Sequence, residues 1–142
     1  MTVRFGYACM NMTLQKGNRD RVTCNRGMIK RTFVEKGLEY ASELSLKNSM
    51  DLIKIIDWNN QQGIKVFRIT SCLFPWMSEY ELEELPDFDS IKFNLEYAGK
   101  IARENNQRLS FHPGHFNILT SNREEVVNNS IVDLTRHGQI FD

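Results

Sequence analysis

The 142-residue sequence predicts an α/β fold, and three observations lead to that class. Three short runs rich in β-branched and aromatic residues are typical of strands. Three longer stretches repeat apolar residues at the spacing of an amphipathic helix. The two kinds of segment alternate along the chain, which favours parallel strands joined by helical crossovers. A doubly wound sheet and a (β/α)8 barrel are both built this way, and both collect functional residues at the carboxyl ends of their strands.

The first predicted strand covers residues 3–10, where Phe5 and Tyr7 alternate with polar or small residues. Alternation with a period of two indicates a strand with one buried face. Residues 11–31 follow as a predicted polar loop, because turn-forming glycine, asparagine and aspartate residues recur there.

The first helix is predicted from about residue 38 to residue 62, with Gly63 at the position where a helix stop is expected. The second strand, residues 64–71, is the most strand-like segment of the sequence because its residues are β-branched and aromatic. The stripe expected along one line of the helix is Leu46, Met50, Ile53 and Asp57, and Leu52, Ile56 and Trp58 widen its apolar face.

The second half of the chain repeats the pattern after an apolar loop and an acidic stretch between residues 79 and 89. Asp89 and Ser90 are predicted to cap a helix that runs to about residue 105. A short strand over 108–112 and a last helix from near residue 123 complete the order. The expected buried stripes of these two helices are Ile91, Leu95, Ala98, Ile101 and Ala102, and Val127, Ile131, Leu134 and Phe141.

Composition excludes several classes of protein. Basic and acidic side chains each number 18, so the formal net charge is zero, which excludes a histone-like protein and an acidic tail protein. No stretch approaches the roughly 20 apolar residues of a membrane span, and the first residues lack the regions of a signal peptide. Three cysteines without a CxxC pair predict reduced thiols. We therefore expect an intracellular protein of cytoplasmic or nuclear type that is not secreted and has no membrane partner.

Histidines mark the end of the third strand, where His112 and His115 bracket a Pro-Gly turn. An imidazole at a strand tip can bind zinc, manganese or iron, although a pair of surface histidines in a turn would give the same pattern. His137 lies on the stripe of the last helix and is expected to be a packed histidine bonded to a neighbour. Tyr7 and Asn11 lie at the end of the first strand, where they could also be a core residue and a turn residue.

Two loops have a composition that suits nucleic acid. In the loop over 11–31, basic residues are met only by Asp20, so phosphate contacts and a simply solvated surface are both open. The apolar residues 74–77 could stack on bases or pack over one end of the fold. The candidate phosphate contacts are Lys16, Arg19, Arg21 and Arg26.

A set of short motifs follows in order along nearly the whole chain, and together they resemble one family. The motifs are Gly6-Tyr-Ala-Cys9 with Asn11 and Thr13; Gly37-Leu-Glu-Tyr-Ala41 followed by Asn48, Asp51-Leu52 and Trp58-Asn59; Phe67-Arg-Ile-Thr-Ser71 leading to Leu73-Phe-Pro-Trp-Met-Ser78; Glu84-Leu-Pro-Asp87; Phe111-His-Pro-Gly114 with Phe116-Asn117; and Asn129-Ser-Ile131 with Asp133-Leu134. Each motif alone is weak, but the ordered set resembles the UV damage endonuclease family, UvdE.

The resemblance implies a (β/α)8 barrel that acts in DNA excision repair by nicking DNA immediately 5′ of UV photoproducts and some other lesions. It also implies phosphodiester hydrolysis by a cluster of divalent metal ions, usually manganese, which activate water and stabilise charge on the phosphate. His112 matches the metal-binding histidine of the family's His-Pro-Gly motif. Cys72 falls where many members carry a histidine or an aspartate, so its role as a ligand is the weaker expectation.

The resemblance further implies four residues at the DNA lesion. Tyr7 and Asn11 match positions that lie near the lesion in the family. His115 and Phe116 stand where the family usually carries a glutamine and an aromatic residue that probe the damaged dinucleotide. Phe116 keeps a ring that can stack, whereas a histidine in place of the glutamine changes the hydrogen bonds available for reading the lesion.

Length departs from the family, because a complete barrel needs roughly 200–250 residues. We expect a single domain over residues 1–142 that holds a partial barrel of three to four βα units and lacks the metal ligands of later strands. Such a chain is either the first half of a longer or interrupted protein or a degenerate homologue. Its open sheet edge and exposed core face predict a complementing C-terminal half or self-association. The alternatives to the nuclease are a non-catalytic remnant that binds DNA weakly and a sugar-isomerase-like barrel.

Overall fold

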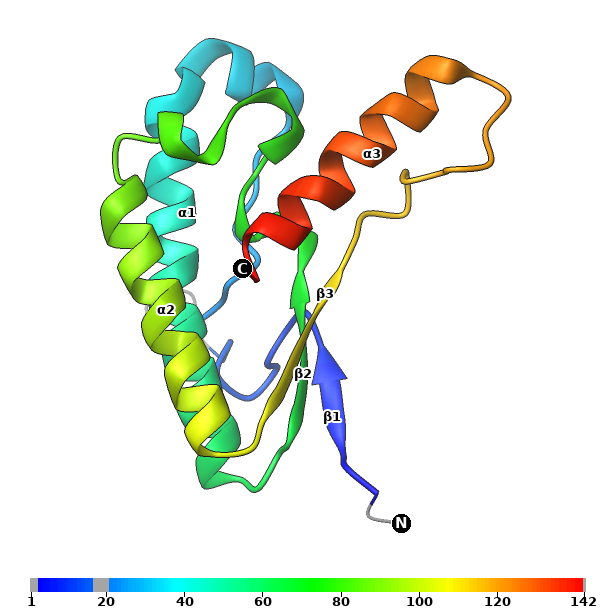
Figure 1. The fold of residues 1–142 in the computed structure, drawn as a ribbon. Helices are drawn as coiled ribbons and strands as arrows, with labels where there is room; N and C mark the ends of the chain where they lie inside the picture. The colour runs from blue at the N-terminus through cyan, green and yellow to red at the C-terminus, as the bar shows by residue number, and fades with distance from the viewer. Residues whose placement is uncertain (1–2, 17–20, 142) are drawn as a thin grey trace.

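In the computed structural model, which describes residues 3–16 and 21–141, three parallel strands form one sheet in the order β1-β2-β3. The elements are β1 Gly6–Ala8, α1 Lys30–Gln61, β2 Val66–Thr70, α2 Phe88–Glu104, β3 Arg108–His112 and α3 Glu124–Gln139 (Figure 1). Three single 3-10 turns, η1 Ser71–Leu73, η2 Met77–Glu79 and η3 Leu82–Glu84, connect β2 to α2. The predicted α/β class, with strands and helices alternating, is confirmed.

The sheet has the arrangement of consecutive units in a barrel. Gly6 pairs with Val66 and Val66 pairs with Arg108, so neighbours in the chain are neighbours in the sheet. Helices α1 and α2 pack side by side on one face of the sheet (Figure 1). A doubly wound sheet would instead reverse its strand order at a switch point and place helices on both faces.

The hydrophobic core lies between that face and the two helices. Phe67 and Ile69 of β2 are buried there with Leu52 of α1 and Ile91 of α2. Successive side chains of a strand point to opposite faces, and Arg68, between the two buried residues, is exposed. The sheet therefore has one face covered by helices and one face that carries polar side chains.

The first strand is shorter than the sequence predicts. Pairing with β2 ends at Ala8, because Cys9 takes a left-handed conformation with a φ of 62° and turns the chain away. Val3 and Phe5, which the alternation placed in the strand, are 73% and 80% exposed. The prediction of a strand over residues 3–10 is therefore wrong at both ends.

Helix α1 begins earlier than expected, and its buried face is rotated from the predicted one. Gly37, with φ 63° and ψ −158°, separates a short segment from the long helix that follows, and this second part matches the predicted helix. Met50 is 49% exposed and Asp57 is exposed, so the predicted stripe is wrong at these positions. The reason is that polar residues share the buried face, which apolar periodicity alone does not show. The buried residues are Ala41, Ser42, Leu44, Ser45, Asn48, Ser49, Asp51, Leu52, Ile55, Ile56 and Asn59.

The N-cap of helix α2 lies two residues before the predicted one. Asp87 is the N-cap residue, and its carboxylate accepts a hydrogen bond from Ser42 Oγ at 2.8 Å instead of bonding its own helix. Ser42 Oγ in turn accepts from the Asp87 backbone N–H at 2.9 Å. The predicted cap at Asp89 and Ser90 is thus wrong, because a side chain of α1 fixes the start of α2.

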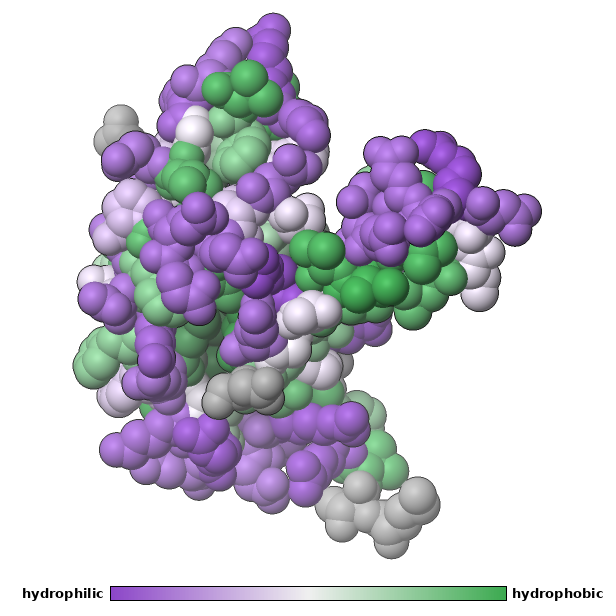
Figure 2. All heavy atoms as spheres, turned by 45° about the horizontal axis from the view of Figure 1, so that its top comes forward, coloured by the Kyte–Doolittle hydropathy of each residue, from purple (hydrophilic) through white to green (hydrophobic). Residues whose placement is uncertain are grey.

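Helix α3 begins where the sequence predicts but is barely covered. Its buried residues are Ser130 and His137, whereas Ile131, expected in the buried stripe, is 50% exposed, as is Phe141 beyond the helix. Figure 2 shows apolar side chains gathered on one side of the projecting arm that α3 and the loop before it form. In the part of the chain that the structure describes, none of the helices combines the length and the apolar character that crossing a membrane requires.

Candidate functional site

Residues expected to carry chemistry gather at the carboxyl ends of the three strands. Asn11 follows β1, Cys72 follows β2, and His112 is the last residue of β3. His112 pairs with Thr70 across the ladder, and paired residues of a parallel ladder project to the same face. His112 therefore lies on the face of the sheet that the helices do not cover.

The hydrogen bonding of His112 suits a ligand. Its ring is partly buried, and Nδ1 lies 3.1 Å from the carbonyl oxygen of Pro113. A neutral imidazole that carries its proton on Nδ1 donates to that oxygen and keeps Nε2 as the electron-pair donor. Metal-binding histidines are commonly oriented in this way.

Cys72 is positioned through its backbone. Its N–H donates to Thr70 Oγ1 at 3.1 Å, and its carbonyl accepts from Asn48 Nδ2 at 2.9 Å. The thiols of all three cysteines are free, and burial raises the pKa of the Cys9 thiol at the end of β1. Over residues 3–16 and 21–141, no group of three or more histidine, cysteine, aspartate or glutamate side chains could hold a metal ion. The described residues therefore do not by themselves form the metal cluster that the family resemblance implies.

Tyr7 and Asn11 belong to a hydrogen-bonded network beneath the strand ends. The Tyr7 hydroxyl donates to Asn59 Oδ1 at 2.6 Å and accepts from Asn11 Nδ2 at 2.8 Å. Burial raises the pKa of Tyr7 to about 12, against the opposing effect of the two asparagine hydrogen bonds. Asn11 Oδ1 also accepts from the backbone N–H groups of Thr13 and Leu14, both at 3.0 Å. These contacts are those of a core residue and a turn residue, and contact with a DNA lesion stays a prediction.

The basic loop divides into a structural part and an exposed part. Arg26 pairs with the Asp51 carboxylate at 2.6 Å and donates to the carbonyls of Thr23 and Arg21, so its guanidinium is engaged within the protein. Lys16 and Arg21 are exposed. Arg19, the remaining candidate for a phosphate contact, lies outside the described residues.

Two residues of α1 fold this loop against the strand ends, and sequence reasoning did not single them out as site residues. Asn48 is fully buried, and its amide bonds the backbone of Arg26 on one side and the carbonyls of Cys72 and Leu73 on the other. Burial alone would raise the pKa of Asp51, but hydrogen bonds from Lys54, Arg26 and the Thr23 N–H hold it below the usual value. The sequence does contain a signal for their burial, since Asn48 and Asp51 fall on the same helix face as the apolar Leu52.

The loop after β3 presents the two residues expected to probe the lesion. His115 and Phe116 are exposed, Phe116 by 78%, and their ring centres lie 3.9 Å apart. Phe116 therefore keeps ring surface that His115 does not cover, and this surface is open for stacking. Of the residues predicted to contact the lesion, these two are accessible, whereas Tyr7 and Asn11 are engaged with protein partners.

The apolar loop over 74–77 packs within the protein. Phe74 and Met77 are buried, and Trp76 Nε1 donates to the Met28 carbonyl at 3.0 Å. The Trp76 ring also lies beside Phe33, with ring centres 6.2 Å apart. Of the two interpretations of this segment, packing over one end of the fold describes these contacts.

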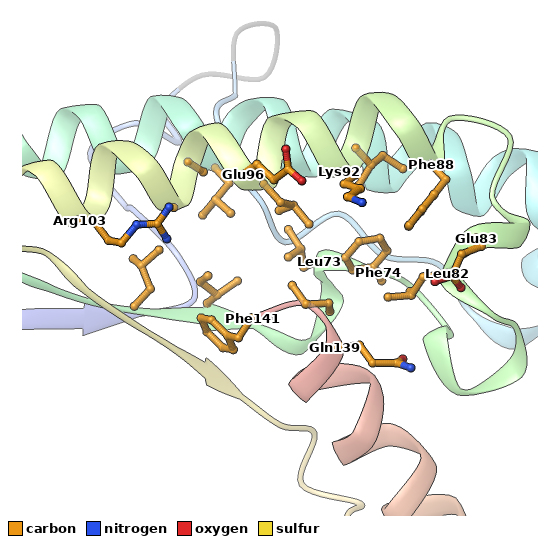
Figure 3. A pocket seen from close by; sticks show the side chains of 18 residues that line it. Leu73, Phe74, Leu82, Glu83, Phe88, Lys92, Glu96, Arg103, Gln139 and Phe141 are labelled. Atoms are coloured by element: carbon orange, nitrogen blue, oxygen red, sulfur yellow. The ribbon is translucent and has the colours of Figure 1, made fainter.

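A hollow of the protein lies away from the strand ends. A cleft of about 570 Å³ lies between α2 and the covered face of the sheet, with the end of α3 at its rim. Figure 3 shows Phe74, Phe88 and Phe141 among its lining side chains, with Lys92, Glu96 and Arg103 of α2 at its edge. It is not lined by His112 or the loop after β3, so it is separate from the strand-end site.

Parallel strands in chain order, helices on one face and polar residues at the carboxyl ends define a protein of the barrel-type α/β class, whose sites lie at that end. Comparison with known proteins gives the family. The model of the family "UV-endonuclease UvdE" matches residues 3–142, and the chain belongs to this family.

Similarity to individual proteins extends over nearly the whole chain. A UV-damage endonuclease of Schizosaccharomyces pombe is 39% identical over 97% of this chain, and a putative UV-damage endonuclease of Acanthamoeba polyphaga mimivirus is 37% identical over 99%. The crystal structure of SacUVDE superimposes with a TM-score of 0.81 at 29% identity over 99% of the chain. The chain spans 22% and 42% of the length of the two relatives and 45% of the SacUVDE chain.

Proposed function

We propose that this chain forms part of a UV-damage DNA endonuclease, which hydrolyses a phosphodiester bond immediately 5′ of a UV photoproduct with the help of divalent metal ions, manganese first among them. The observation that carries the proposal is the position of Phe116 in a chain of the UvdE family. Its exposed ring follows His112 at the carboxyl end of β3, where barrel-type proteins bind their substrates.

In this proposal, damaged DNA lies over the strand ends. Phe116 stacks on a displaced base, and His115 beside it adds a hydrogen bond or, when protonated, a positive charge. Lys16 and Arg21, which are both exposed, contact phosphates, and the sequence adds Arg19 as a further candidate. Tyr7 and Asn11 hold the end of β1 in place through their hydrogen bonds. Their contact with the lesion is limited to the atoms that those hydrogen bonds leave accessible.

Catalysis requires more than the residues described above. His112, with Cys72 as a weaker candidate, supplies one or two ligands, which is too few for the metal cluster that hydrolysis requires. We therefore propose that the remaining ligands come from a complementing segment. The 142 residues alone are expected to bind DNA without cleaving it, and the three free thiols suit a reducing compartment inside the cell.

The exposed apolar residues of α3 and its loop support such a complementing partner. Ile131 is 50% exposed, Ile118 48% and Leu119 54%, and an exposed apolar patch is typical of an interaction surface. Light scattering of the purified chain is expected to show dimers or larger assemblies. A monodisperse monomer with a sharp, cooperative melt would contradict this part of the proposal.

Cleavage is tested with UV-irradiated supercoiled plasmid and Mn²⁺. The purified 142-residue chain is expected to leave the plasmid intact, whereas addition of the remaining part of a UvdE relative as a separate chain is expected to produce nicks. Nicks should disappear when His112→Ala replaces the natural chain in the mixture. Nicking by the chain alone would show that its own residues suffice, and nicking by the His112→Ala mixture would remove His112 from the proposal.

DNA recognition is tested by titrating UV-damaged and intact duplexes at two salt concentrations. Phe116→Ala is expected to reduce the preference for damaged DNA, since a base stacked on an aromatic ring is worth about 1–3 kcal/mol. The double variant Lys16→Ala/Arg21→Ala is expected to weaken both duplexes alike and to flatten the salt dependence. Equal loss of preference in the two variants would contradict this division of roles.

A further inference from the structure

The loop that presents His115 and Phe116 is fastened to α3 at its base. Asn117 Nδ2 donates to Asp133 Oδ2 at 2.6 Å and also lies 3.2 Å from the carbonyl oxygen of Gly114. One amide group therefore links the two sides of the turn to the helix. A second anchor follows directly, since the Ile118 N–H donates to Ser130 Oγ at 2.9 Å.

Asp133 is itself held against β3 through His137. The His137 ring nitrogen Nδ1 lies 2.7 Å from the backbone oxygen of Asp133 and 3.5 Å from its carboxylate. The ring is 5% exposed and meets Phe111 edge-on, with ring centres 4.8 Å apart. Phe111 immediately precedes His112, so a continuous chain of contacts joins the loop to the strand end.

We infer that Asn117 is the positioning residue that fixes the His115–Phe116 tip relative to His112, acting through Asp133 and His137. The inference rests on the proposed function, because it assigns these residues to the recognition of damaged DNA. An aromatic ring distinguishes a displaced base from a stacked one only when the ring is held in a fixed position over the strand ends. Phe116 is 78% exposed, so its own side-chain contacts do little to fix that position. Without the amide of Asn117, the backbone N–H of residue 117 still closes the turn on the Gly114 carbonyl, but that bond does not reach α3. The link from the loop to the helix then rests on the bond from Ile118 to Ser130.

The expected effect follows from the kind of bond that is lost. A hydrogen bond from an amide to a carboxylate is charge-assisted and stronger than a neutral one. The Asp133 side chain is 22% exposed, so water screens part of that strength. We expect Asn117→Ala to lower the preference for damaged over intact DNA by roughly tenfold, with little change in the affinity for intact DNA.

The position of the tip can be observed without DNA. Para-fluorophenylalanine at position 116 gives a fluorine NMR line that reports how the ring is held. In the natural sequence we expect a shifted, broadened line, and in Asn117→Ala a narrow line near the value of a flexible peptide. Thr135→Ala is the matched control, because it removes a side-chain hydrogen bond within α3, to the Ile131 carbonyl, without touching the loop.

A conservative pair separates positioning from folding. Asn117→Asp places two carboxylates together and is expected to release the tip as Asn117→Ala does. Combining it with Asp133→Asn restores one amide–carboxylate bond with donor and acceptor exchanged, so the fluorine line and part of the DNA preference are expected to return. If Asn117→Ala does not fold, the comparison of Asn117→Asp with this double variant carries the test.

Three results would overturn the inference: an unchanged fluorine line in Asn117→Ala, the same line in Asn117→Asp and in the double variant, or a released tip in the Thr135→Ala control. Failure of the proposed function has a different signature. In that case the natural chain shows no preference for damaged DNA, while the fluorine lines still report whether Asn117 holds the tip.

Discussion

The body of the protein, from β1 to β3, and the arm formed by residues 113–141 both place a helix after a strand, but their helices are covered to very different extents. In the body, α1 buries eleven residues, whereas α3 buries only Ser130 and His137 within the part of the chain that the structure describes. Both helices are amphipathic in sequence. The comparison shows that an apolar stripe identifies what a helix can bury, while the presence of neighbours decides what it does bury.

The largest expected effect separates the two regions directly. Phe67 is fully buried beneath α1 and α2, and Phe67→Ala is expected to lower the free energy of unfolding by about 3–5 kcal/mol. Ile131→Ala in α3 is expected to change it by about 0.5 kcal/mol or less, because half of that side chain is already in water. Urea denaturation followed by circular dichroism measures both. Similar losses in the two variants would mean that the arm is as well packed as the body.

The glycines of the two regions are expected to respond in opposite directions. A methyl group on Gly6 would lie 2.0 Å from the Val66 carbonyl oxygen, so Gly6→Ala is expected to cost about 3 kcal/mol, at the upper end for overpacking. Gly138 in α3 has open space where a methyl group would lie, and Gly138→Ala is expected to stabilise its helix by up to about 1 kcal/mol. Thermal melts of the two variants test the signs. Stabilisation by Gly6→Ala would contradict the close approach of β1 and β2.

Acid is expected to act on the body through Asp51. Its pKa is lowered in the folded protein, so its contribution is present above the ordinary value of 3.8 and is lost as the pH falls through the folded value. Asp51→Asn is expected to cost about 2 kcal/mol at neutral pH and to cost less as the pH falls below 3.8. Denaturation at a series of pH values measures this. A constant cost over the whole range would exclude the carboxylate charge as its cause, and Asp57→Asn at an exposed position of the same helix is the control.

The smallest expected effect concerns Tyr7. Its folded pKa of about 12 lies above the ordinary 10, so its contribution is present below pH 10 and is lost as the pH rises through about 12. Tyr7→Phe removes the hydroxyl shared by Asn11 and Asn59 and is expected to cost about 1 kcal/mol at neutral pH. It should also remove part of the alkaline sensitivity of the melt. Tyr97→Phe, at an exposed position of α2, is the control and should leave that sensitivity unchanged.

Local patterns were sufficient to predict much of the fold. The strand over 108–112 and the start of α3 lie where the sequence predicts them, because turn formers and apolar periodicity agree at those points. The early end of β1 could not be predicted, since it depends on a left-handed backbone conformation at Cys9. Nothing about a cysteine side chain indicates that conformation. The buried face of α1 could not be predicted either, because Asn48 is buried through hydrogen bonds to backbone groups that lie far away in the sequence. A local pattern of apolar residues does not contain that information.

For the candidate site, the sequence predicted the place better than the contacts. Alternating strands and helices placed Asn11, Cys72 and His112 at one end of the sheet, where the structure has them. The residue that accepts the hydrogen bond of the Tyr7 hydroxyl, however, is Asn59, which lies 52 residues further along the chain. The same holds for Arg26, which is a phosphate candidate by composition but is engaged by Asp51, 25 residues away.

The length of chain between paired strands also indicates the order in which the sheet can assemble. Val66 pairs with Arg108 across a shorter stretch of chain than the one that separates it from Gly6, and the entropy of closing a loop rises with its length. The unit of α1, β2, α2 and β3, in which a helical crossover joins two parallel strands, can therefore form before β1 pairs with it. Since β1 contributes only three paired residues, it is also the element that should detach first under strain. Amide protons of β1 are accordingly expected to exchange with solvent faster than those of β2, and a transient species without β1 would expose the edge of β2.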